Sequence, residues 1–212
     1  MITTEELIKK VRCLINEAEA DSDVSLITDD KRSLDKTIVE LLPQAVALAQ
    51  KNSNGGYVNV KALTKDNRRI EKSSDGFFAV VLPEGFVALV SLQLDSWKKP
   101  CSHIASPDSA KALNVCNNSA YGVFRPQCVE GVTEQGERVV KLFPCDAENS
   151  VMHFVYEAQF DADEGLGRCD EYMADAVAYI CTSLLYSVFE RYDAAKSFMS
   201  YAMALCGKNK NE

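Results

Sequence analysis

The organising segment of this chain spans residues 171–189 and reads EYMADAVAYICTSLLYSVF. Placed on a helix of 3.6 residues per turn, it shows an aliphatic stripe and a separate tyrosine stripe. The aliphatic stripe consists of Met173, Ala176, Val177, Ile180, Leu184 and Val188, and the tyrosine stripe of Tyr172, Tyr179 and Tyr186. A helix that is apolar on nearly every side needs partners on nearly every side. We therefore predict a central packed helix, covered by its own chain or shared with neighbouring subunits.

A membrane-spanning role for this segment is disfavoured by its polar residues. Glu171 and Asp175 lie inside it, and Thr182, Ser183 and Ser187 occupy its second half. The first residues, MITTEELIKK, have no apolar core after a basic region, so we expect no signal peptide. The eight cysteines are then expected to be thiols in a reducing compartment.

The composition is that of an ordinary soluble globular protein, with 47% hydrophobic and 25% charged residues. A chain of 212 residues can bury a sizeable core without a metal or disulfide. The formal net charge of −8 argues against a general nucleic-acid-binding surface, because neutralising phosphates needs a basic face.

Helical patterns lie at both ends of the chain. Thr3 and Glu6 form a capping box ahead of an amphipathic helix of about four turns. A second helix is predicted from about residue 33 to residue 52, with Pro43 inside it as a kink. After the central helix, a fourth helix is predicted to end at Gly207, and residues 208–212 form a polar tail.

Between these helices the apolar period changes to two, which predicts strands. The predicted strands lie in residues 57–62, 77–82, 86–94, 127–132, 139–143 and 151–160. Residues 64–76 and 101–123 are expected to be loops. The resulting fold class is α+β, with a bundle of about four helices in residues 1–56 and 161–212 and an inserted β-rich subdomain in residues 57–160.

Only one Cys/His cluster is apparent, formed by Cys101, His103 and Cys116. Zinc sites usually have a closely spaced pair of ligands on each side, and the second pair is missing here. No phosphate-binding loop or nucleophile motif is present, so we expect no enzyme and no cofactor. A metal- or thiol-dependent enzyme that uses these three residues is the alternative hypothesis.

A short basic run offers a third hypothesis, that of a DNA-binding module. The run contains Lys65, Arg68, Arg69 and Lys72. Because acidic residues offset it and no aromatic residues interleave it, we interpret it as a solvated hairpin loop.

Two segments of the β region resemble a known family. The first is LPEGFVALVS, residues 82–91, running to Trp97-Lys98-Lys99-Pro100. The second is NNSAYG, residues 117–122, leading to Arg125-Pro126. Together with the helical frame, they resemble the head-to-tail connector proteins of tailed phages. Within that family the chain resembles the adaptor or ring proteins of crAss-like phages, which are similar in plan to the tail tubular protein A type of adaptor.

This resemblance implies a structural protein of the virion neck, made in the cytoplasm of the host bacterium and without a membrane partner. Such subunits form a ring, usually of twelve copies, that binds the portal and other neck or tail rings. Double-stranded DNA passes through the ring without sequence-specific binding. The side chains expected to meet a neighbouring subunit or partner, each of which could instead pack within its own subunit, are Tyr172, Tyr179, Tyr186, Trp97, Tyr201, Met203 and Lys208.

Overall fold

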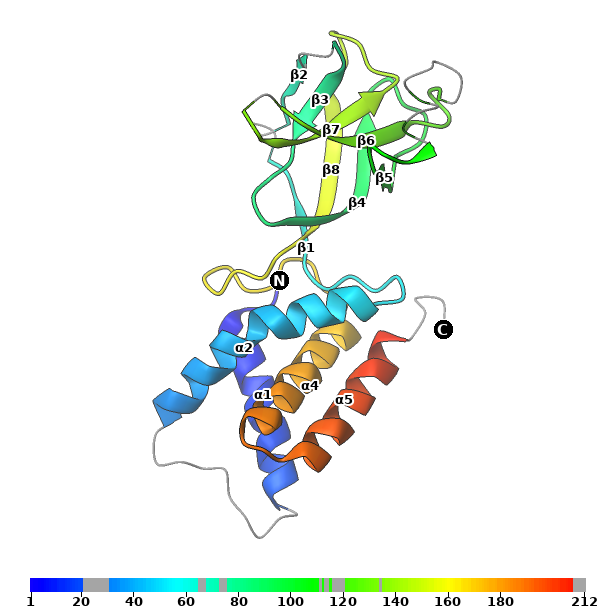
Figure 1. Ribbon diagram of the computed structural model, residues 1–212. Helices are drawn as coiled ribbons and strands as arrows, with labels where there is room; N and C mark the ends of the chain where they lie inside the picture. The colour runs from blue at the N-terminus through cyan, green and yellow to red at the C-terminus, as the bar shows by residue number, and fades with distance from the viewer. Residues whose placement is uncertain are drawn as a thin grey trace. The chain divides into compact units, whose positions relative to one another are not determined.

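The structure is a computed structural model (Figure 1). It describes residues 1–20, 31–64, 68–72, 76–110, 112, 115, 121–133 and 135–207. The chain divides into two compact units. Residues 1–60 and 159–212 form the helical unit, and residues 61–158 form the β unit.

The described helices of the helical unit are α1 (Thr4–Ala20), α2 (Lys31–Asn52), α4 (Glu171–Val188) and α5 (Tyr192–Cys206). Helix α4 contacts all three of the others, and Figure 1 shows it between α2 and α5. Along α4, Met173, Val177, Ile180 and Leu185 are fully buried, together with apolar residues of α1 and α2. The prediction of a central packed helix is confirmed, and the chain supplies the partners itself.

Sequence signals at the helix ends are also confirmed. The Thr3 N–H donates to Glu6 Oε2 at 2.8 Å and the Glu6 N–H donates to Thr3 Oγ1 at 3.2 Å, which is a reciprocal capping box. Helix α2 continues through Pro43 as one helix. No helix among the described residues is both long enough and apolar enough to cross a membrane.

The β unit contains two sheets, one ordered β1-β8-β4 and the other β2-β3-β7-β6-β5. The strands are β1 (Val60–Ala62), β2 (Ile70–Lys72), β3 (Phe78–Val81), β4 (Phe86–Leu94), β5 (Ile104–Ala105), β6 (Gln127–Val132), β7 (Arg138–Phe143) and β8 (Val151–Ala158). Both sheets contribute to one buried core, with Leu92 and Phe154 from the first and Val140 and Leu142 from the second. The fold is therefore α+β, a helical bundle with an inserted β-rich part.

Two of the expected loops contain strands. Residues 70–72 form β2, which pairs with β3, and residues 104–105 form β5, which runs parallel to β6. Both strands have only two or three residues, too few for an alternating pattern to stand out in the sequence. The alternation expected along β4 is also interrupted, because its register against β8 shifts at three places.

Candidate subunit interface

Four aromatic rings form a ladder between α4 and α5. Tyr186 stacks on Phe198, with centroids 5.4 Å apart and planes 9° apart. Tyr179 lies 6.0 Å from Phe198 and 6.0 Å from Tyr201. Exposure rises from 1% at Tyr186 to 64% at Tyr201. The ladder thus begins in the core and ends on the surface, so only its outer part is available to a partner.

Two of the predicted interface residues lie in cores. Tyr186 belongs to the core of the helical unit and Trp97, 2% exposed, to the core of the β unit. The indole N–H of Trp97 donates to the Pro144 carbonyl oxygen at 2.7 Å, which satisfies its only polar atom. Because neither side chain has free surface in the folded subunit, we leave both out of the proposed interface.

Tyr172 lies half-buried at the start of α4. Its hydroxyl has no hydrogen-bond partner among the described residues, and burial raises its pKa. A Cβ atom at Gly56 would lie only 2.7 Å from this hydroxyl and 2.8 Å from Met173 Cγ. A glycine at position 56 therefore leaves the space that Tyr172 and Met173 fill.

The structure does not bring Tyr201 and Met203 together. Helix α5 buries a narrow seam of Ala195, Ala202 and Cys206 against the rest of the bundle. Residues two positions apart on a helix point about 200° apart, so Tyr201 and Met203 lie on opposite sides of that seam. Met203 is half-buried and Tyr201 exposed. Lys208, the last predicted interface residue, lies outside the described residues.

The exposed apolar surface of the helical unit is concentrated on α4 and α5. Apart from Met1, its large exposed apolar side chains in the described ranges are Val188, Phe189, Tyr192 and Tyr201. Three of these four lie at the turn between the two helices, which the sequence indicated only as a break after the central helix. These neighbouring exposed apolar side chains are therefore a candidate contact surface.

The α4–α5 turn has a defined backbone geometry. The Arg191 N–H donates to the Tyr186 carbonyl oxygen at 2.9 Å. The Glu190 N–H donates to the Ser187 carbonyl oxygen at 3.1 Å. These two bonds are those of a Schellman motif, in which the left-handed position is usually glycine. Here that position is Glu190, with φ of 59°. The turn therefore holds a glutamate at a strained site.

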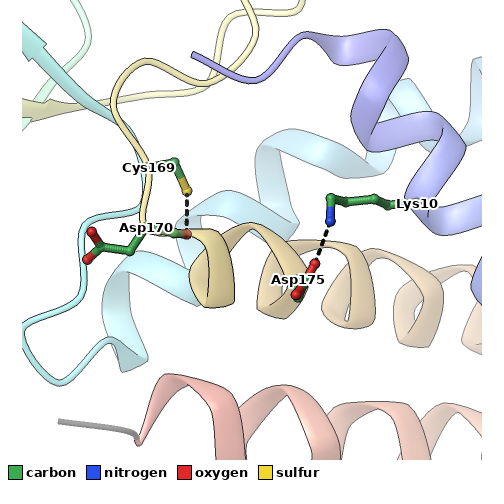
Figure 2. A network of polar contacts seen from close by, with 4 residues as sticks. All are labelled: Lys10, Cys169, Asp170 and Asp175. Carbon is green, nitrogen blue, oxygen red and sulfur yellow. Dashed lines mark hydrogen bonds and ion pairs between the residues drawn. The ribbon is translucent and has the colours of Figure 1, made fainter. Parts of the chain in front are cut away.

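Polar contacts fix the first half of α4 to its surroundings (Figure 2). Lys10 Nζ of α1 lies 2.6 Å from Asp175 Oδ1, and this hydrogen bond raises the pKa of Lys10. Asp170 accepts a hydrogen bond from the Tyr57 N–H at 2.9 Å, and the Cys169 thiol donates to the Asp170 carbonyl oxygen. The Lys10–Asp175 pair is some 40% exposed, so it contributes positioning more than stability.

Two members of the Cys/His cluster, Cys101 and His103, lie among the described residues. Cys101 is buried, and its thiol donates to the backbone carbonyl oxygen of His103 at 3.1 Å, while the His103 side chain is exposed. Contact with Cys101, together with burial, raises the pKa of the neighbouring Cys128 well above its usual range. Cys116 lies outside the described residues, within which no group of three potential ligands is placed to hold a metal ion. Buried thiols of this kind behave as small apolar groups.

Arg68 of the basic run makes structural contacts. The Arg68 guanidinium donates to the backbone carbonyl oxygens of Leu63 and Met152. Arg69 pairs with Glu71 at 3.6 Å, and Lys65 lies outside the described residues. The guanidinium of Arg68 thus connects a loop to β8, whereas Arg69 and Lys72 are exposed.

The second histidine, His153, contacts a serine. His153 Nε2 of β8 lies 2.8 Å from Ser91 Oγ of β4. A catalytic Ser–His pair also needs a group that orients the imidazole, and within the described ranges no carboxylate hydrogen-bonds to His153. We interpret the contact as a cross-strand hydrogen bond.

Comparison of the sequence with known proteins gives no identification, because no family model and no curated protein matches the chain.

Proposed function

We propose that this protein is a structural subunit of a phage head-to-tail connector, assembled as a ring below the portal. The proposal rests on the resemblance of residues 82–100 and 117–126 to such connectors. One observation supports it further: the first segment meets residues 121–126, the described part of the second, because the Lys98 N–H donates to the Val123 carbonyl oxygen at 2.8 Å. The two stretches that carry the resemblance are thus brought together in the fold at Lys98 and Val123.

The surfaces of the described residues also support an assembling protein. The helical unit exposes the aromatic side chains of Phe189, Tyr192 and Tyr201, and Tyr201 is the outer end of a ladder that starts in the core. Ring subunits contact each other head to tail, so each contact joins two different patches of the same chain. The excess negative charge, −8 per chain, would let DNA move through such a ring without strong attraction to its wall.

The proposal is tested in purified phage particles that encode this chain. Antibodies to the protein, labelled with gold, should decorate the junction between capsid and tail in electron micrographs of disrupted particles. Labelling along the tail fibres, or absence of the protein from particles that retain their portal, would count against a connector.

A further inference from the structure

One exposed turn of the β unit combines positive charge with an aromatic side chain. We call Lys98, Lys99, Phe124 and Arg125 the basic turn. The hydrogen bond from the Lys98 N–H to the Val123 carbonyl oxygen, 2.8 Å long, joins the segment after β4 to the segment before β6. Phe124 is 65% exposed, so the ring is presented to solvent rather than packed.

The cations of the basic turn have no ion-pair partner among the described residues. In the described part of the chain, no carboxylate pairs with the side chains of Lys98, Lys99 or Arg125, and all three are exposed. Unpaired cations beside an exposed aromatic ring are suited to a partner that offers carboxylates and apolar surface.

The α4–α5 turn of the helical unit offers that combination. We call Val188, Phe189, Glu190, Tyr192 and Asp193 the acidic turn. Its apolar members are exposed by 57% at Val188, 38% at Phe189 and 67% at Tyr192. The carboxylates of Glu190 and Asp193 have no ion-pair or hydrogen-bond partner among the described side chains.

Arg191, the one cation in this turn, is half-buried and already engaged within the subunit. Glu190 and Asp193 outnumber this one cation, so the turn keeps an excess of negative charge. The strained backbone of Glu190 also supports a role for its charge. A glycine at φ of 59° would avoid the strain but would remove the carboxylate.

The distribution of charge over the whole chain agrees with this pairing. The two segments of the helical unit contain 12 basic and 19 acidic residues, a net charge of −7. The β unit contains 11 basic and 12 acidic residues, a net charge of −1. A second copy of this chain is thus an acidic partner for the basic turn, and attraction would steer the two together.

We propose that the basic turn of one copy docks on the acidic turn of a second copy. The aromatic side chains form the centre of this contact, and the ion pairs surround it. Because the two turns differ, the contact is head to tail and can close into a ring. The inference rests on the proposed connector function and names the surfaces that it would use.

The test is sedimentation velocity of the full chain over a range of concentrations, with exchanged charges. The variant Lys98→Glu/Lys99→Glu and the variant Glu190→Lys/Asp193→Lys should each associate more than about tenfold more weakly than the wild type. Mixing the two variants should restore association, because each reversed turn then meets a reversed partner and each native turn meets a native one. Higher salt should weaken the wild-type contact.

Two variants separate docking from folding. Phe124→Ser should weaken association without changing the thermal unfolding midpoint, whereas the control Val132→Ser, at a site that is 62% exposed in the same unit, should change neither. Glu190→Gly should weaken association while unfolding at an equal or higher temperature, because it relieves the left-handed strain.

Three outcomes would overturn the docking pair. A wild-type chain that stays monomeric at every concentration has no such contact. If the sedimentation coefficients of the wild type and the charge variants differ by the same amount at every concentration, the two turns dock within one chain. Assembly that survives both charge reversals would place the contact elsewhere and leave the connector proposal standing. Absence of the protein from the neck of wild-type phage particles would instead overturn the connector proposal.

Discussion

The contact between the N-terminal residues and the loop before α4 allows us to predict how much stability the protein loses when Gly165 is replaced. This glycine has φ of 72°, and a Cβ atom there would lie 2.5 Å from the backbone oxygen of Ile2. The same oxygen accepts a hydrogen bond from the Leu166 N–H at 2.9 Å, and the Ile2 N–H donates to the Leu166 carbonyl oxygen at 3.1 Å. Backbone atoms cannot rotate away as a side chain can, so Gly165→Ala should break this bridge.

The expected loss of stability has two parts. Placing alanine in a left-handed conformation costs about 1–2 kcal/mol. Opening two backbone hydrogen bonds, each with a net contribution of about 0.5–1.5 kcal/mol, adds about 1–3 kcal/mol. The matched control is Gly55→Ala, because Gly55 has φ of 79° but nothing within 4 Å of an added Cβ. The control should show the conformational part alone.

The assay is urea unfolding of both variants, followed by the circular dichroism of the helices at about 222 nm. Gly165→Ala should be less stable than Gly55→Ala by about 1–3 kcal/mol, with an unchanged dependence on urea. Equal losses in the two variants would refute the reasoning, because they would mean that the Ile2–Leu166 bridge does not constrain residue 165.

Three further predictions concern the helical unit. Ile180→Ala, at a fully buried site on α4, should reduce the free energy of unfolding by about 2–5 kcal/mol in the same assay. A loss below about 1 kcal/mol would mean that α4 is not the central packed helix. Hydrogen bonds from Thr3 lower the pKa of Glu6 below the 4.5 of an ordinary glutamate, so the capping box stabilises the protein above that pH and loses its effect as the pH falls through the lower pKa of the folded state. Glu6→Gln should therefore reduce the acid dependence of the free energy of unfolding. An unchanged dependence of that free energy on pH would contradict the capping box. Burial raises the pKa of Cys181 to about 12, whereas Cys13 is exposed. Iodoacetamide should therefore alkylate Cys13 in the folded protein and Cys181 only after unfolding, which mass spectrometry of tryptic peptides would report. Rapid alkylation of Cys181 under native conditions would contradict its burial.

The helical frame could be predicted from sequence because its signals are local. The capping box at Thr3, the long apolar segment of α4 and the terminal position of Gly207 each depend on residues within one or two turns. The hairpin of β6 and β7 was predicted for the same reason, since a short turn connects its two alternating strands.

The strands β2 and β5 could not be predicted, because partners elsewhere in the chain define them. Ile70 pairs with Val80, and Ile104 pairs with Cys128, so these short segments become strands only once the sheet exists. Their own sequences carry no period.

The candidate interface was predictable in part. The sequence named Tyr179 and Tyr201, which lie in the outer part of the aromatic ladder, but it could not separate them from Tyr186, which Phe198 covers. Helical periodicity indicates which residues share a face, and it does not indicate how far a neighbouring helix extends over that face. The exposed turn around Glu190 depends on where α4 ends, which periodicity leaves open by a residue or two.

The central claim, that copies of this chain assemble into a connector ring, is tested most directly by cryo-electron microscopy of the protein mixed with the portal of the same phage. We predict a closed ring of identical subunits stacked on the portal, with the acidic turn of each subunit against the basic turn of its neighbour. A protein that stays monomeric and does not bind the portal would contradict it.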